Sequence, residues 1–204
     1  MASKKQNVAP VSAEITANRL EAFSDGVIAI IITIMVLELK VPHDTTPAGL
    51  LSAWPVFLSY ALSYLMVAIY WMNHHHLFQL IRKVDTRILW SNMFLLFSVS
   101  LIPFSTAYMG ESHIAAFPTA IYSGILLLCA VAYLVLVAAL AGKLDKTPDM
   151  ACLLRAMLLK NLSAILLYAL GVVAAFYQPA ITLGLALIVA VMYILPNAWL
   201  EKRK

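Results

Sequence analysis

Long apolar segments make up most of this chain and constrain its fold more than any other feature. A helix that crosses a bilayer needs about 20 mainly apolar residues, because the hydrocarbon core is about 30 Å thick. Six segments meet this condition: 19–39, 51–78, 88–108, 118–141, 152–175 and 179–200. The breaks between them are rich in charged residues, glycine or proline. The sequence therefore predicts an all-α integral membrane protein with six transmembrane helices.

Composition supports this class and defines the parts of the chain. Hydrophobic residues make up 63% of the sequence and charged residues only 12%, whereas soluble domains average about 45–50% and about 25%. The excess is too large for the core of a soluble domain. We predict a polar tail at 1–18, a six-helix membrane domain at 19–200 and a short tail at 201–204. The first tail lacks the apolar stretch of a cleaved signal peptide.

The basic residues favour one orientation in the membrane. Short cytoplasmic loops carry an excess of Lys and Arg. If both termini are cytoplasmic, all basic residues except Lys40 fall on the cytoplasmic side. These residues are Lys4, Lys5, Arg19, Arg82, Lys83, Arg87, Lys143, Lys146, Arg155, Lys160, Lys202, Arg203 and Lys204. Topology and contact with anionic lipid of the bilayer then explain the net charge of +4, and no nucleic-acid partner is expected.

No pattern indicates a metal centre or a cofactor. Cys129 and Cys152 lie in different apolar segments, outside any CxxC spacing, and are expected to be free thiols. The three consecutive histidines at 74–76 cannot share one helical face, because adjacent residues point about 100° apart. We therefore expect neither a metal ion nor a cofactor.

The first apolar segment carries unexpected charges near its start: Arg19, Glu21 and Asp25. Ionisable groups within a span are costly and usually face protein or water. Arg19 and Asp25 are about 240° apart on a helix, so they cannot easily pair. Glu21 and Asp25 share one face and repel each other. Asp25 should therefore find its partner on another helix.

The stretch "NHHHLF" at 73–78 offers that partner at a matching depth. The second helix runs in the opposite direction, so His74 and His75 arrive near the level of Asp25, and Asn92 begins the third helix at a similar height. We expect a polar network of Arg19, Asp25, one histidine and Asn92 that joins the first three helices. The alternative is that the histidines simply lie in the headgroup region. A histidine here could also titrate near neutral pH.

These residues carry a family resemblance. Arg19, Phe23, Ser24 and Asp25, followed by "GVIAI", match an RxxxFSD signature. With "NHHHLF", they make the chain similar to the transmembrane protein 175 family, which includes lysosomal and endosomal potassium channels of animals. Bacterial members have one six-helix repeat per chain, and the length of this chain points to that branch.

The resemblance implies a homotetramer in a bacterial inner membrane, with the first helix of each subunit lining a central pore. It implies a channel permeable to potassium in preference to sodium, with protons as a further permeant ion. The TVGYG filter is absent from the sequence. In the family, the narrowest ring of apolar side chains lies five residues after the motif aspartate, which corresponds to Ile30. Further pore-facing positions correspond to Thr33 or Ile34 and to Leu37.

The residues themselves leave the pore face open. Ile30, Ile34 and Leu37 lie within about 60° of one another on a helix and can form one stripe. The helix is apolar all round, so the same residues could contact only lipid or core. Thr33 could bond to the carbonyl of residue 29 or place a hydroxyl at a pore axis.

Acidic residues flank the first segment on both sides. Glu38 and Asp44 near its outer end, and Glu21 near its inner end, could enrich cations at the pore mouths. Each could equally be a solvated surface acid.

Two other function classes remain as alternatives. A proton-coupled secondary transporter would use Asp25 and a histidine as a relay. Such transporters favour helices broken near mid-membrane, and Pro103 is one of few interruptions here. A membrane enzyme or scaffold is the other alternative. No HExxH motif, paired carboxylates or nucleophile elbow occurs in the sequence, so the chain is not expected to be an enzyme.

Overall fold

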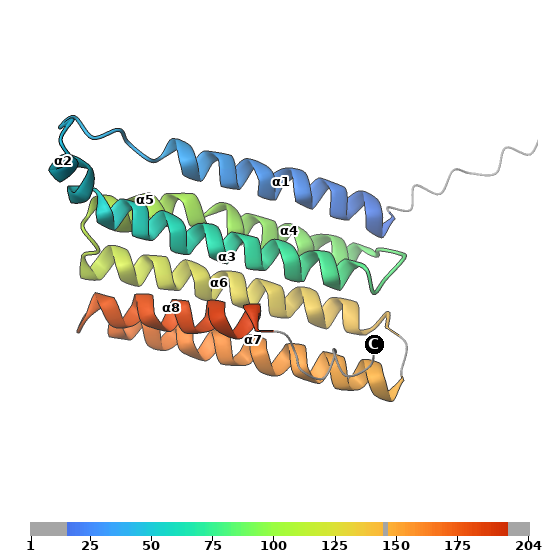
Figure 1. Cartoon of the computed structure of the whole chain (residues 1–204). Coiled ribbons are helices and arrows are strands. Elements are labelled where there is room, and N and C mark those ends of the chain that lie inside the picture. Colours follow the sequence, from blue (N-terminus) through green and yellow to red (C-terminus); the bar gives the residue numbers. More distant parts are fainter. Residues whose placement is uncertain (1–15, 145–146, 196–204) are drawn as a thin grey trace, which may run out of the picture.

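The computed structural model is all-helical and describes residues 16–144 and 147–195. Within these residues, five helical stretches are long and apolar enough to cross a membrane. They are α1 (Ala17–Leu37), α3 (Trp54–Phe78), α4 followed by α5 (Thr86–Glu111), α6 (Ala116–Ala141) and α7 (Pro148–Ala174). The shorter helix α8 (Pro179–Ile194) is also apolar. The long helices lie side by side and roughly parallel to one common axis, as expected of a multi-pass membrane protein (Figure 1).

The second and third predicted segments are each divided into two helices. A short helix, α2 (Pro47–Ser52), precedes α3, which begins at Trp54 instead of extending back to residue 51. The third segment is broken at Leu101 into α4 (Thr86–Ser100) and α5 (Ile102–Glu111). Pro103 lies in the first turn of α5, and its missing N–H removes a hydrogen bond from a continuous helix.

The sixth segment is shorter than its prediction of 179–200. α8 ends at Ile194, and Leu195 has an extended backbone with φ −63° and ψ 121°. Residue 196 is proline, which disfavours the α conformation of the residue before it. Lys160 of α7 donates a hydrogen bond to the carbonyl of Leu195 at 3.3 Å and so stabilises this helix end. Residues 196–200 and both predicted tails up to residue 15 and from 201 lie outside the described residues.

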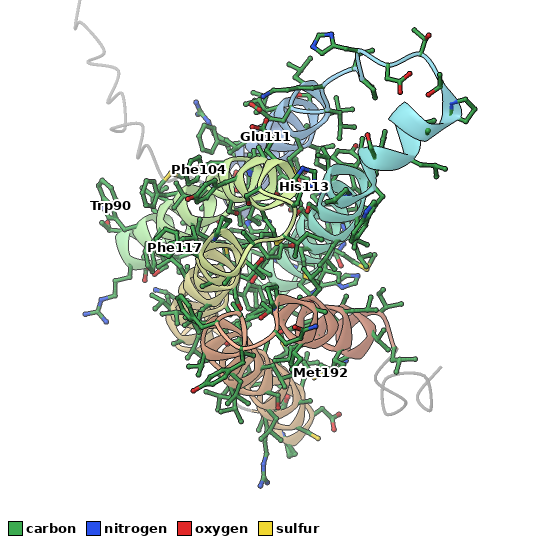
Figure 2. All side chains as sticks on the ribbon, turned by 90° about the vertical axis from the view of Figure 1, so that its left-hand side faces the viewer. Trp90, Phe104, Glu111, His113, Phe117 and Met192 are labelled. Atoms are coloured by element: carbon green, nitrogen blue, oxygen red, sulfur yellow. The ribbon has the colours of Figure 1, made fainter. Side chains whose placement is uncertain are left out.

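The helices form a bundle with α1 at one edge. α1 packs against α3, α4 and α5, whereas α6 contacts α4, α5, α7 and α8. Figure 2 shows α1 and the α7–α8 pair on opposite sides of the bundle. The centre of the core is α6, in which Tyr122, Leu126 and Cys129 are fully buried. Because α1 is held on one side only, its other side forms part of the subunit surface.

Contacts between loops close the end of the bundle where α1 begins. The backbone N–H of Ala17 donates to the carbonyl of Arg82 at 3.3 Å, which attaches the start of α1 to the α3–α4 loop. Asp85 in that loop caps α4 by accepting from the N–H of Ile88 at 3.0 Å. Its other oxygen lies 3.0 Å from the ammonium of Lys143. Three loops or ends that we predict to be cytoplasmic are thus joined at one end.

Asp85 makes this junction sensitive to pH. The hydrogen bond from Ile88 and the neighbouring Lys143 lower the pKa of the Asp85 carboxyl below its ordinary value. Its contribution to stability is therefore present above the pKa of the unfolded chain, about 3.9, and is lost as the pH falls through the folded pKa.

We expect the thermal midpoint of the purified protein at neutral pH to fall for Asp85→Asn and to fall further for Asp85→Ala. The asparagine can still cap α4 but cannot pair with Lys143, whereas the alanine can do neither. The difference between wild type and Asp85→Ala should shrink below about pH 4, as measured by thermal unfolding in detergent across pH. A difference that stays constant down to pH 3 would contradict this role of the carboxylate.

Candidate functional site

α1 has an anchored face and an exposed face. Thr16 caps its start by accepting from the N–H of Arg19 at 3.4 Å. The buried side chains recur every three or four residues, which gives a helix one inward face; they are Ala17, Leu20, Ser24, Ile28, Ile31 and Met35. On the other face, Ile30, Ile34 and Leu37 are 60%, 43% and 80% exposed. These three residues, here called the exposed stripe, lie along the C-terminal part of the helix.

Thr33 lies beside the exposed stripe and is itself exposed. Its hydroxyl donates to the carbonyl of Ile30 at 2.8 Å. The expected acceptor was the carbonyl of residue 29, so the back-bond forms one residue later than predicted. Both lone pairs of the hydroxyl oxygen remain available as acceptors on the exposed side.

A groove of about 740 Å³ lies between α1 and α5. Ile30 and Ile34 line one wall, and Phe104 and Tyr108 line the other with their ring centroids 6.0 Å apart. Figure 2 shows Phe104 and Glu111 on the part of the bundle nearest α1. Two residues of the exposed stripe, Ile30 and Ile34, therefore form part of one wall of a largely apolar groove.

Charged groups line the end of this groove that lies nearest the C-terminus of α1. The ammonium of Lys40 lies 2.6 Å from the carboxylate of Glu111, and their hydrogen bond raises the pKa of Lys40. Glu38 also lines the groove. Glu38 therefore lies at the same end of the groove as the last residue of the exposed stripe.

A buried chain of hydrogen bonds holds the inward face of α1. His74 Nε2 and Asn92 Oδ1 are 2.8 Å apart. Asn92 Nδ2 donates to Ser24 Oγ at 2.9 Å, and Ser24 Oγ donates to the carbonyl of Leu20 at 2.9 Å. His74, Asn92 and Ser24 are at most 1% exposed. This Ser24–Asn92–His74 chain links α1, α4 and α3.

The geometry assigns the direction of these bonds. Because the amide nitrogen of Asn92 is used on Ser24, its oxygen must accept, so His74 Nε2 carries the hydrogen. His74 Nδ1 then has no hydrogen-bond partner among the described residues. The imidazole ring stacks on Phe78 with centroids 4.4 Å apart, so packing fixes its orientation.

A second, more exposed set of contacts joins α1 to α3. Asp25 accepts a hydrogen bond from Trp71 Nε1 at 3.0 Å. Glu21 lies 2.6 Å from His75 Nδ1, and His75 Nε2 lies 2.8 Å from Gln79. The expected pair between Asp25 and a histidine is thus replaced by a pair with Trp71, which sequence reasoning missed. Its position one helical turn before His75 was the available signal.

Arg19 and Phe23 do not join these contacts. Both are exposed, and no side-chain partner of Arg19 is found in the part of the chain that the structure describes. The structure therefore does not bring Arg19 into the expected network.

Glu21 precedes Ile30 by nine residues, which places Glu21 about 180° away from Ile30 around the helix. Glu21 belongs with the contacts to α3 and not with the exposed stripe.

Comparison with known proteins places this arrangement in a family. The model of the endosomal/lysosomal potassium channel TMEM175 matches residues 19–103. A protein named as a potassium channel, from Chryseobacterium sp. (strain P1-3), is 43% identical over 187 residues, which are 92% of this chain and 97% of that protein. The chain belongs to the TMEM175 family.

Other members show the range of the family. The crystal structure of a lysosomal potassium-selective channel TMEM175 homolog from Chamaesiphon minutus superposes with a TM-score of 0.76 and 28% identity, covering 92% of this chain and 98% of that one. The endosomal/lysosomal proton channel TMEM175 of Danio rerio is 31% identical over 120 residues, 56% of this chain and 22% of that protein. The TMEM175 family is thus one of ion channels and not of enzymes.

The buried chain generates a stability prediction. Asn92→Leu leaves His74 without a partner on either ring nitrogen, so we expect a loss of about 1–3 kcal/mol. Adding His74→Phe to Asn92→Leu should cost less than His74→Phe costs in the wild type, because the unpaired imidazole is then removed. Thermal unfolding of the two single variants and the double variant measures this coupling.

Ser91→Ala provides a matched control next to Asn92. Its exposed hydroxyl donates only to the carbonyl of Arg87 within its own helix, so we expect a change within about 0.5 kcal/mol. Strict additivity of Asn92→Leu and His74→Phe would show that the two side chains are not coupled.

Proposed function

We propose that this protein is a potassium-permeable cation channel, selective for potassium over sodium. The channel is a homotetramer in the inner membrane of a bacterium, with both termini cytoplasmic. The α1 helices of the four subunits line a central pore. The observation that carries the proposal is the exposed stripe of Ile30, Ile34 and Leu37, opposite an anchored face, in a chain whose relatives are named as potassium channels.

The residues of α1 support close approach of several copies. Ala22, Gly26 and Ala29 are exposed and lie on the helix next to the exposed stripe. A Cβ added to Gly26 would meet nothing within 4 Å in the single subunit. Small residues are enriched where membrane helices pack closely. These positions therefore suit contacts between neighbouring copies, while the larger side chains of the stripe face the axis.

The proposed constriction is apolar. A ring of four isoleucines at position 30 closes by dewetting when it is narrow and passes cations when it is wider. Thr33 adds a ring of hydroxyl oxygens one turn further along the helix, where a partly dehydrated potassium ion can be coordinated. Selectivity then depends on the width of these rings, because the sequence contains no TVGYG filter. Glu38 near the outer mouth raises the local concentration of cations.

Protons are a second permeant ion in this proposal. Animal relatives such as that of Danio rerio are named as proton channels. The apolar rings exclude a continuous hydration shell, and a proton needs only a single file of water. Transporter sites commonly use broken helices. The transporter alternative receives less support, because α1 is helical from Ala17 to Leu37 without a break and the broken span of α4 and α5 carries neither Asp25 nor a histidine.

Ile30→Asn tests the constriction. Replacing the apolar ring by amides should wet the narrowest part of the pore, so we expect higher flux and lower selectivity for potassium over sodium. The measurement is ion flux from liposomes that contain purified protein. Ile188→Asn is the matched control, since Ile188 on α8 is 55% exposed against 60% for Ile30. Equal selectivity of Ile30→Asn and wild type would exclude position 30 as the constriction.

Cysteine crosslinking tests the tetramer and its axis. In a Cys152→Ser background, which removes the exposed native thiol, Ile30→Cys should form disulfide-linked dimers upon mild oxidation in membranes. The same change at Ile188 should give few dimers, because α8 lies on the side of the bundle opposite α1 (Figure 2). Efficient crosslinking at position 188 but not at position 30 would mean that the subunits meet through α8 and not through α1, which would contradict the proposal.

A further inference from the structure

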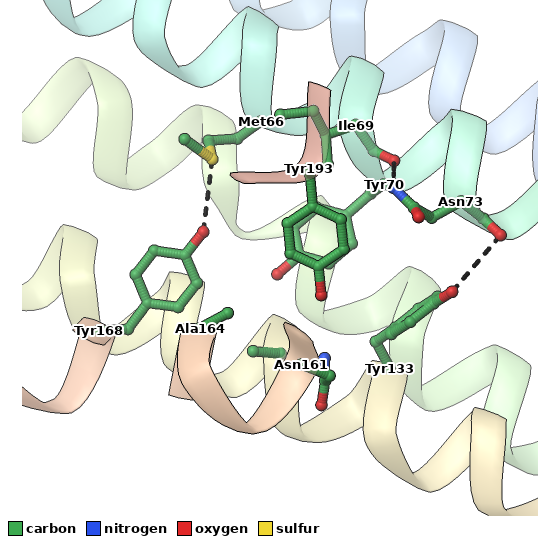
Figure 3. A pocket seen from close by; sticks show the side chains of 10 residues that line it. Met66, Ile69, Tyr70, Asn73, Tyr133, Asn161, Ala164, Tyr168 and Tyr193 are labelled. Atoms are coloured by element: carbon green, nitrogen blue, oxygen red, sulfur yellow. Dashed lines mark hydrogen bonds between the residues drawn. The ribbon is translucent and has the colours of Figure 1, made fainter. Parts of the chain in front are cut away.

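A small cavity lies between α3, α6, α7 and α8, away from the exposed stripe (Figure 3). Its volume is about 10 Å³. Four tyrosines line it, one or more from each helix: Tyr70, Tyr133, Tyr168 and Tyr193. The side chain of Asn161 also lines it. A cluster of polar groups inside a membrane-spanning bundle needs hydrogen-bond partners, since neither lipid nor bulk water supplies them.

The tyrosine hydroxyls have poor partners. Tyr70 and Tyr133 donate to the carbonyls of Leu126 and Asn73, each at 3.5 Å, whereas O–H···O bonds are commonly about 2.7–2.8 Å long. Tyr168 donates to the sulfur of Met66 at 3.4 Å, and a thioether is a weak acceptor. All three hydroxyls therefore retain much of their capacity for a better bond.

Asn161 is the least satisfied polar side chain in this cluster. It is 2% exposed, and its amide nitrogen faces the hydroxyl of Tyr193 (Figure 3). Its Oδ1 atom has no partner among the described residues. Buried side-chain oxygens are nearly always paired with protein or with ordered water, so this atom points to a missing hydrogen-bond donor.

We propose that this cavity binds a single water molecule. A turn of the Asn161 amide, whose oxygen points away from the tyrosines in Figure 3, would bring that oxygen within reach of the water beside the nearest tyrosine hydroxyls. A site for one water needs about 10–15 Å³ and two to four polar partners. The entropic cost of holding one water is smaller than that of leaving a buried carbonyl oxygen and several hydroxyls poorly paired. A cation fits less well, because no acidic residue lines the described cavity and a buried charge without a counter-charge is costly.

The position of the water gives it a structural role. On α3, the lining residues Met66, Tyr70 and Asn73 point away from Trp71 and His75, by about 150° on average. Trp71 and His75 contact α1. The water would therefore link the cavity-facing side of α3 to α7 and α8, while the opposite side of α3 contacts α1. This site goes beyond the proposed conduction path, and it can be tested without measuring ion flux.

Radiolytic footprinting of the full-length protein in detergent tests for the water directly. Brief X-ray exposure makes hydroxyl radicals from bound water, and these label adjacent side chains even when the side chains are buried. Tyr133 and Tyr168 are 3% and 2% exposed and should be labelled several-fold faster than Tyr122. Tyr122 is the matched control, since it is fully buried and its hydroxyl accepts a hydrogen bond from Ser63 at 3.1 Å. Equal, slow labelling of all three would overturn the proposal.

Asn161→Leu gives a second test with a defined sign. If the water is bound, removing its amide partner should lower the thermal midpoint and abolish the excess labelling of Tyr133 and Tyr168. If the cavity is dry, Tyr133 and Tyr168 should be labelled as slowly as Tyr122 in both the wild type and the variant, which would overturn the proposal. Should the variant fail to fold, the labelling of the wild type still decides between the two.

Discussion

The rest of the structure depends on how α1 is held by one face only. The Ser24–Asn92–His74 chain joins three helices through side chains that are at most 1% exposed. In a low-dielectric interior such bonds are strong, and an unpaired member is costly, so the chain permits few rotations of α1 about its own axis. Fixing this rotation determines which residues of a uniformly apolar helix point outward. The exposed stripe is therefore a consequence of the buried chain.

Hydrophobicity alone was enough to predict the membrane class and the approximate spans, because each span must satisfy the thickness of the bilayer. The interruptions were harder to predict. Pro103 was noticed in the sequence, but the break of the third span at Leu101 was not predicted. The early end of α8 before Pro196 could have been read from the sequence, but the contact of Lys160 with the carbonyl of Leu195 could not. Such long-range contacts leave no periodic signal in the sequence.

The polar contacts, too, were predicted only in part from the sequence. Depth along the helices predicted that a histidine and Asn92 would lie near the start of α1. The depth of a residue in the membrane does not specify how its helix is rotated about its own axis. Consecutive histidines point about 100° apart, so depth alone cannot tell which of them faces α1 or α4. Packing directs His74 to Asn92 and His75 to Glu21, and it places Trp71 against Asp25. A tryptophan is usually assigned to the membrane interface or the core, so its role as a hydrogen-bond donor to Asp25 required the structure.

These contacts divide α1 along its length into an anchoring part and a proposed conducting part. The groups bonded to α3 and α4 are Glu21, Ser24 and Asp25, all within the first three turns. Beyond Asp25, Thr33 is the only side chain of α1 with a polar group. An ion on the proposed axis would pass the anchoring part first and then meet apolar rings with few competing charges. A carboxylate at the constriction would bind cations and slow their exit. Restricting the acids to the anchored face and to the helix ends therefore suits permeation.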